Sequence, residues 1–222
     1  MPASRIAERL QEVRLRITSA CLRCDRSPQE VTLIAVTKGF AVEAIREAYE
    51  AGLRHFGENR VQEALGKTPV LAELPDITWH MIGHLQTNKV KTAINLFDII
   101  HSVDSLHLAE EISRRAPQTV SAFLEANVSG ESSKFGMSPR EISERYESIA
   151  ALPNIEVRGL MTVAQLAANP EQARAVFRQL RETGETLGLR ELSMGMTGDF
   201  ETAIEEGATH IRVGRAIFGE RD

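Results

Sequence analysis

The chain has 222 residues, of which 42% are hydrophobic and 26% charged, as is usual for a globular protein. Its formal net charge of −5 gives no excess of basic residues for nucleic acid or an anionic membrane, so neither is expected as a partner. At this length we expect a single domain over residues 1–222. No stretch approaches the ~20 apolar residues that span a bilayer, and the N-terminus lacks the apolar segment of a secretory signal. A cytoplasmic protein is therefore expected.

The first predicted element is an amphipathic helix at about residues 4–24, for which Ser4 is a plausible cap. Four apolar residues recur in it at helical spacing: Ile6, Leu10, Val13 and Ile17. The only cysteines, Cys21 and Cys24, lie on one face of its last turns. A redox Cys-x-x-Cys normally opens a helix after a strand, and a zinc site needs two more ligands nearby. We therefore expect reduced thiols and no metal.

From residue 31 onward, strand-like apolar segments alternate with helical patterns. Eight strands are predicted, at residues 31–38, 53–57, 78–83, 98–103, 121–128, 156–163, 191–195 and 210–214. Helices are predicted between them, at residues 41–51, 58–67, 86–96, 105–116, 138–151, 170–187 and 199–206. Three of these helices are followed by the residue that most often ends a helix in the left-handed conformation: Gly52, Gly188 and Gly207.

Eight strands with helices between them predict an α/β fold, a single (β/α)8 TIM-type barrel at about residues 31–220 with an additional N-terminal helix. An open doubly wound sheet shows the same alternation. It usually has about five to seven strands and a glycine-rich turn after the first, whereas strand one here ends Thr37-Lys38-Gly39-Phe40. The barrel is the favoured prediction.

Lys38 ends the first predicted strand and shares a face with Ile34 and Val36 if the residues alternate. Such a lysine is either a surface group whose stem covers apolar residues or a functional amine. The segment alone does not decide between the two.

The loops after strands seven and eight often hold phosphate in barrels of this type. Here they read SMGMTGD and RVGRA, at residues 193–199 and 212–216. Their glycines allow backbone N–H groups to approach an anion, and the arginines add charge. The alternative is that these are ordinary turn glycines and surface arginines. Asp199 would repel a phosphate if its side chain faced inward.

Strand eight pairs with strand one in a closed barrel, so the phosphate loops and Lys38 are expected to be neighbours. This arrangement suits a phosphorylated aldehyde that forms a Schiff base with Lys38. Two ligand classes fit, pyridoxal 5′-phosphate (PLP) and the sugar phosphate of an aldolase.

Eight segments in order, AVTKGF, HFGENRVQEA, WHMIGHLQTNK, HSVDS, SKFGM, GLMTV, LSMGMTGDFETAI and RVGRAIFGER, resemble the YggS/PROSC family of pyridoxal phosphate homeostasis proteins. The resemblance covers residues 31–221. It implies a barrel like the N-terminal domain of alanine racemase, with PLP held as an internal aldimine on Lys38. It also implies phosphate-loop contacts from seven residues: Ser193, Gly195, Met196, Thr197, Arg212, Gly214 and Arg215. Many members of the family have a small hydroxyl residue where this chain has Arg215, which leaves that contact in doubt.

Further candidates follow other predicted strands. Asn59 could bond the ring hydroxyl of the cofactor or cap the next helix. His84 and Asn88 follow strand three, where His84 could line the site or be held by backbone groups. Met161 and Thr162 end strand six and are expected to form a wall of the site.

Two residues have predominantly structural interpretations. Lys134, in the loop after strand five, could cover the site or contact the cofactor, but a solvated charge is the simpler interpretation. Trp79 lies inside an apolar strand and is predicted to belong to the core.

The favoured hypothesis is a PLP carrier and regulator with little or no catalysis and no catalytic residue. Racemases of this kind have a second, β-rich domain, for which no residues follow position 222, so a shallow, wet site and a monomer are expected. Candidate protein partners are PLP-dependent apo-enzymes or a regulatory protein. The alternatives are a weak PLP-dependent amino-acid racemase or decarboxylase, and a class I Schiff-base aldolase.

Overall fold

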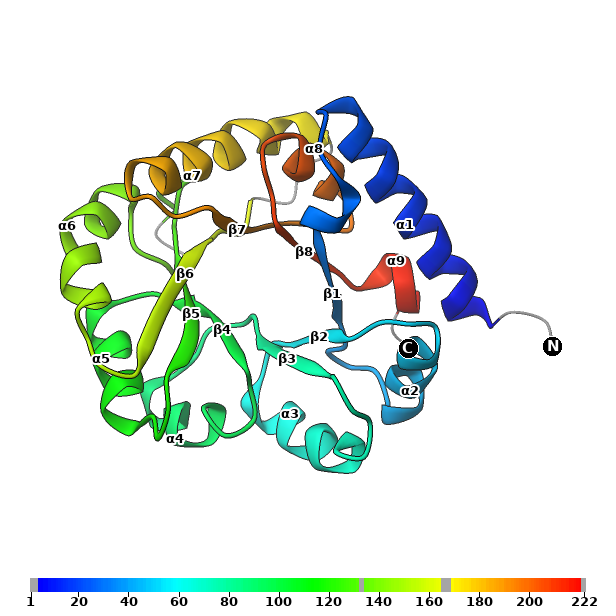
Figure 1. The fold of residues 1–222 in the computed structure, drawn as a ribbon, viewed down its shortest axis with the longest axis horizontal. Helices are drawn as coiled ribbons and strands as arrows, with labels where there is room; N and C mark the ends of the chain where they lie inside the picture. The colour runs from blue at the N-terminus through cyan, green and yellow to red at the C-terminus, as the bar shows by residue number, and fades with distance from the viewer. Residues whose placement is uncertain (1–3, 132–133, 165–168, 221–222) are drawn as a thin grey trace.

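Eight parallel strands form a closed barrel in the computed structural model, which describes residues 4–131, 134–164 and 169–220. The strands follow one another in chain order, and β8 pairs with β1 to close the ring (Figure 1). They are β1 (Thr32–Val36), β2 (His55–Glu58), β3 (Thr78–Met81), β4 (Ile99–Val103), β5 (Val120–Glu125), β6 (Ile155–Met161), β7 (Glu191–Met196) and β8 (His210–Val213). The predicted barrel is confirmed.

Helices surround this ring on its outside (Figure 1). They are α1 (Arg5–Arg23), α2 (Val42–Glu50), α3 (Val61–Lys67), α4 (Val90–Ala93), α5 (Leu106–Arg115), α6 (Pro139–Ala150), α7 (Arg174–Thr186), α8 (Phe200–Glu205) and α9 (Arg215–Phe218). Short 3₁₀ turns are η1 (Pro28–Glu30), η2 (Thr68–Leu71), η3 (Thr87–Lys89) and η4 (Pro170–Ala173).

Two of the predicted elements differ from the structure in ways that bear on the site or the barrel wall. The helix expected at residues 86–96 is the 3₁₀ turn η3 followed by the single turn α4. Strand one ends at Val36 rather than Lys38, because Phe40 N donates to Thr37 O at 3.0 Å and Gly39 takes a φ of +77°. The chain thus forms a turn over residues 37–40 that contains Lys38.

The glycines that end three helices have the conformation that the sequence predicts. Gly52, Gly188 and Gly207 have φ angles of +90°, +70° and +99°. This left-handed region costs glycine little, so each helix can stop and lead into the next strand.

The core has two parts, on either side of the ring of strands. Apolar residues of the helices pack on the outside of the barrel, and Trp79 is buried among them, as predicted. A smaller apolar cluster of Ile99, Phe123 and Met161 lies apart from this outer core. Much of the remaining interior is polar, as described below.

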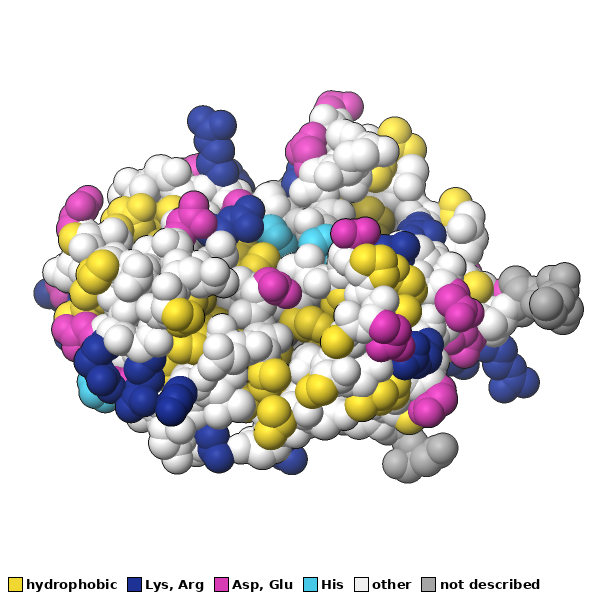
Figure 2. Space-filling view, turned by 60° about the horizontal axis from the view of Figure 1, so that its bottom comes forward, with side chains coloured by type: hydrophobic (Ala, Val, Ile, Leu, Met, Phe, Trp, Pro, Cys, Tyr) yellow, Lys and Arg dark blue, Asp and Glu magenta, His cyan; other side chains and the backbone are white. Residues whose placement is uncertain are grey.

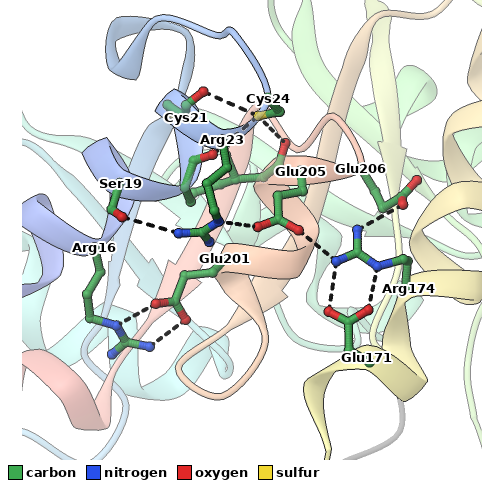
Figure 3. A network of polar contacts seen from close by, with 12 residues as sticks. Arg16, Ser19, Cys21, Arg23, Cys24, Glu171, Arg174, Glu201, Glu205 and Glu206 are labelled. Carbon is green, nitrogen blue, oxygen red and sulfur yellow. Dashed lines mark hydrogen bonds and ion pairs between the residues drawn. The ribbon is translucent and has the colours of Figure 1, made fainter.

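Helix α1 packs along α8 and α9 with its apolar stripe buried (Figure 1). Ser4 caps it, since its hydroxyl accepts from Ala7 N at 3.2 Å. An ion network ties its polar face to α8: Arg16 donates to Glu201 at 3.0 and 2.8 Å, and Arg23 donates to Glu205 at 2.7 Å (Figure 3). The added helix is therefore held by both apolar packing and ion pairs.

The two cysteines at the end of α1 are free thiols, as the sequence predicts. Cys21 is buried in the last turn of the helix, whereas Cys24 is its C-cap. The Cys24 thiol lies 3.3 Å from Ala20 O (Figure 3 shows Cys24 beside the ion network).

Acidic and basic side chains are interspersed over the face drawn in Figure 2. No helix in the described ranges is long and apolar enough to cross a membrane.

Candidate functional site

Lys38 lies half-buried in the turn that follows β1, at the end of the barrel where the strands finish. The residues on either side of it are fixed by hydrogen bonds. Thr37 N donates to Gly57 O at 3.0 Å, and Gly39 N donates to Glu63 Oε1 at 2.5 Å. The backbone is thus held on both sides of the lysine.

A buried ammonium supports this turn from outside the barrel. Lys67 Nζ, from the end of α3, donates to Thr37 O at 2.8 Å, to Glu58 Oε1 at 2.7 Å and to Glu63 Oε1 at 2.7 Å. Glu58 also accepts from the Thr37 hydroxyl at 2.6 Å. We call Thr37, Glu58, Glu63 and Lys67 the turn cluster.

Within the turn cluster, burial most disfavours the charged form of Glu58. Its side chain is fully buried, and its second oxygen, Oε2, has no hydrogen-bond partner among the described residues. Burial raises the pKa of Glu58, whereas the hydrogen bonds from Lys67 and Thr37 oppose that shift.

The loop after β8 lies directly beside the end of β1, as the closed barrel predicts. A Cβ atom added to Gly214 would lie 3.3 Å from Val36 O, two residues before Lys38. The neighbouring strand residue Arg212 is buried and faces inward. Its Nη1 donates to Ser193 Oγ at 2.7 Å and its Nη2 to Thr162 O at 2.8 Å.

Arg212 brings a permanent positive charge to this end of the barrel. Burial lowers the pKa of Arg212 to about 10, and Asp199 and Glu125 oppose that effect. The guanidinium therefore remains charged at neutral pH.

The loop after β7 offers backbone donors beside this arginine. No hydrogen bond engages the N–H groups of Thr197 and Gly198 within the described part of the chain. Met196 N is already committed, because it donates to the Asp199 carboxylate at 2.6 Å. Asp199 thus turns back onto the loop, and burial raises its pKa.

Gly195 and Arg215 are also predicted to contact the phosphate, and the structure shows how each is placed. Gly195 has a φ of +91°, and a Cβ there would lie 2.6 Å from Ala203 Cβ, so α8 packs on β7 only if this residue is glycine. Arg215 is exposed, and its Nη1 lies 4.0 Å from Glu220 Oε1.

Asn59 and His84 line the same pocket of about 390 Å³ at this end of the barrel, next to Lys89. Asn59 does not cap α3, whose N-cap is Arg60, and Asn59 Oδ1 is buried with no partner among the described residues. His84 is held by a side chain rather than by backbone: its Nδ1 lies 3.0 Å from Asp104 Oδ2, and its ring stacks on Phe135 at 3.7 Å.

Glu125, the last residue of β5, is a further buried carboxyl whose Oε2 has no hydrogen bond to any described residue. Burial and the charge of Asp104 raise the pKa of Glu125 to about 7, while Arg212 acts in the opposite direction. At neutral pH this carboxyl is therefore divided between its charged and neutral forms.

The remaining candidates lie around the site rather than at its centre. Met161 is fully buried in the small apolar cluster, and the Thr162 hydroxyl donates to Ala126 O at 2.8 Å. Lys134 pairs with Glu131 at 2.7 Å. Asn88 belongs to the 3₁₀ turn η3.

Sequence reasoning missed several inward-facing polar residues, because it treated their strands as apolar. These are Glu125 and three histidines of β2, β3 and β4: His55, His80 and His101. The histidines stand in the segments HFG, WHM and IHS, where strand periodicity could have placed them on the inner face of the barrel.

A sequence profile of the alanine racemase N-terminal domain matches residues 16–222 of this chain. A pyridoxal phosphate homeostasis protein of Aquifex aeolicus is 46% identical, over 96% of this chain and 97% of its own length. One from Pseudomonas aeruginosa is 45% identical over 99% and 97%. The chain belongs to this family. The resemblance that the sequence motifs predict is thereby confirmed.

Solved structures of family relatives have the same fold. PipY of Synechococcus elongatus without PLP is 42% identical, with a TM-score of 0.87 over 96% of this chain and 100% of that one. PipY with PLP bound is 41% identical, with a TM-score of 0.84 and the same coverage. Alanine racemase of Clostridium difficile, at 13% identity and a TM-score of 0.74, covers 94% of this chain and 56% of that one and shares the fold alone.

Proposed function

We propose that this protein binds PLP at the strand ends of the barrel, holds it through the amine of Lys38, and acts in PLP homeostasis. The observation that carries the proposal is the juxtaposition of the Lys38 turn with the Gly214 loop, beside the buried charge of Arg212. The PLP-bound structure of PipY, a relative 41% identical over nearly the whole chain, supports the choice of ligand.

The donor set of the site fits a phosphorylated pyridine aldehyde. We propose that the phosphate lies on the backbone N–H groups of Thr197, Gly198 and Gly214, near the charge of Arg212. Asn59 Oδ1, which is buried without a partner in the described ranges, would accept from a ring substituent. When bound, PLP supplies an aldehyde that reacts with amines, and Lys38 supplies the amine.

Some predicted contacts change role in this proposal. The Ser193 hydroxyl is committed to Arg212 and to a histidine, so we assign Ser193 to the support of Arg212. Met196 N is committed to Asp199, and the exposed Arg215 is left as a peripheral charge. His84 and Met161 are assigned to the walls of the site.

We further propose that the protein holds PLP as a carrier without turning over a substrate. Relatives that are 45% and 46% identical over nearly their whole length are named homeostasis proteins, which favours this role. The expected partners are PLP-dependent apo-enzymes or a regulatory protein in the cytoplasm. The large exposed apolar residues lie on several elements, including Leu15 on α1 and Leu65 on α3, which favours a monomer.

One observation favours a second candidate, weak PLP-dependent amino-acid chemistry. Such chemistry needs a positioned acid or base besides the lysine, and Glu125 is a buried carboxyl with a pKa raised to about 7. Its Oε2 has no partner within the described residues and is therefore available to a ligand.

Absorbance titration of the purified full chain with PLP tests the function. We expect a saturable new band with the parent chain and none with Lys38→Ala, whereas the exposed matched variant Lys91→Ala should behave as the parent. A parent protein that takes up no PLP at excess would refute the proposal. Exchange of amino-acid α-protons in deuterated water that requires Glu125 would establish the second candidate instead.

A further inference from the structure

A line of hydrogen-bonded side chains crosses the inside of the barrel. His55 Nδ1 lies 3.1 Å from His80 Nε2, and His80 Nδ1 lies 2.9 Å from His101 Nε2. His101 Nδ1 lies 2.9 Å from Ser193 Oγ, which accepts from Arg212 Nη1. Since β4 and β7 are not neighbours in the ring, the contact between His101 and Ser193 is made across the interior. We call His55, His80, His101 and Ser193 the histidine column.

Arg212 sets the direction of every hydrogen bond in the histidine column. A guanidinium has donors only, so Ser193 Oγ must accept from it. The Ser193 hydroxyl makes no hydrogen bond to another acceptor among the described residues, so its proton is assigned to the bond with His101 Nδ1. His101 then carries its own proton on Nε2 and donates to His80 Nδ1.

The same reasoning assigns the proton positions of the other two rings, His80 and His55. His80 carries its proton on Nε2 and donates to His55 Nδ1, which leaves the Nε2 proton of His55 at the outer end. His55 is half-buried, whereas His80 and His101 are buried. All three rings are thus Nε2-protonated and neutral.

Burial supports the neutral state of these rings. His80 and His101 are fully buried, and desolvation holds the pKa of each well below its ordinary value. Desolvation also lowers the pKa of the less buried His55. The column therefore adds no charge to the interior.

The charged and titratable groups around the histidine column and Arg212 come from several strands and loops: Asp98, Glu125, Arg158, Glu191, Asp199 and His210. Arg158 opposes a positive charge on His80 and on His101. The charge of Asp98 favours a positive charge on a histidine of the column, and it does so only for His55. Protonation should therefore begin at the outer end of the column.

We propose that the histidine column positions the guanidinium of Arg212 for the cofactor. Ser193 and Thr162 O hold the two Nη atoms, while no described residue engages Nε by a hydrogen bond. A neutral column fixes the arginine without pairing its charge, which remains available to an anionic or electron-rich ligand. The reference to the cofactor rests on the proposed function, whereas the tautomers of the column do not.

Nitrogen-15 NMR of histidine-labelled full-length protein tests the column without PLP. We expect Nε2–H tautomers for His55, His80 and His101, with His80 and His101 unchanged between pH 5.5 and 8. Single His→Asn variants assign the signals, and the exposed His107 provides the reference resonance. An Nδ1–H tautomer or a charged ring at His80 or His101 would overturn the proposal, whether or not the protein binds PLP.

Two substitutions at His101 test the positioning of Arg212. In the parent chain the ring centroids of His101 and Phe123 are 4.4 Å apart and the rings are stacked. His101→Phe keeps an aromatic ring at this place but removes both nitrogens. We expect it to weaken PLP binding about tenfold and to shift the absorbance of the bound cofactor. His101→Asn keeps an acceptor for Ser193 and should remain within about threefold of the parent.

The matched control is His107→Asn, which should leave binding and spectrum unchanged. A folded His101→Phe protein with parental affinity and spectrum would refute the positioning role. Should that variant not fold, the NMR tautomers of the unmodified chain still decide the proposal.

Discussion

Glu125 shows how a single residue makes stability depend on pH. Folding raises its pKa from 4.5 to about 7. Between these values the folded chain keeps a proton that the unfolded chain has released, so the free energy of unfolding falls as the pH rises from about 4.5 to about 7.

Glu125→Gln stays neutral at every pH and removes this penalty. We expect the variant to exceed the parent in free energy of unfolding by about 2 kcal/mol at pH 8 and to differ little at pH 5. Urea unfolding at the two pH values measures the difference. The exposed Glu110→Gln is the control and should not change the pH dependence. An equal effect of Glu125→Gln at both pH values would contradict the raised pKa.

At the residue scale, local sequence identified the lysine and the glycine loops but not their supports. Lys38 and Gly214 stand out because each has a local signal, a strand end or a phosphate-loop pattern. Glu125 has no such signal, since its pKa depends on burial in the closed barrel, on Asp104 after β4 and on Arg212 of β8. Such contacts are defined only once the barrel has closed.

Helix α1 allows a buried and an exposed leucine of the same element to be compared. Leu10, on its inner face, is 1% exposed, whereas Leu15 is 61% exposed. We expect Leu10→Ala to lower the free energy of unfolding by about 3 kcal/mol, because it leaves a cavity. Leu15→Ala should stay within about 0.5 kcal/mol of the parent. Equal losses in urea unfolding would show that α1 is not docked as described.

The turn cluster joins α3 to the turn that carries Lys38. Lys67→Met leaves Glu58 as a buried charge without its partner, so we expect a loss of about 3 kcal/mol in unfolding free energy, together with weaker PLP binding. The exposed Lys91→Met serves as the control. Adding Glu58→Gln to Lys67→Met should recover part of the stability. A Lys67→Met protein as stable as the control would refute the role of the cluster.

At the scale of elements, periodicity placed all eight strands but not every helix. Residues 86–96 have a helical pattern, yet they form η3 and the four-residue α4. Helix α9 is also only four residues long, too short for periodicity to identify. Asp199, which would repel a phosphate if its side chain faced inward, instead accepts a hydrogen bond from Met196 N within its own loop.

For the whole molecule, we propose that residues 1–222 form one cooperative domain. Trp79, the only tryptophan, is buried 5.8 Å from Phe56 and reports on the packing of β2 and β3. Its fluorescence and the far-ultraviolet circular dichroism should follow one urea transition with the same midpoint. Two separated midpoints would contradict a single domain.

The central claim is that PLP is held by Lys38 at the strand ends of the barrel. The most direct test is borohydride reduction of the PLP-loaded full chain, followed by peptide mass spectrometry. We predict one pyridoxyl-phosphate adduct, located on Lys38 and absent from Lys38→Ala. An adduct that maps to another lysine, or that survives in Lys38→Ala, would contradict the claim.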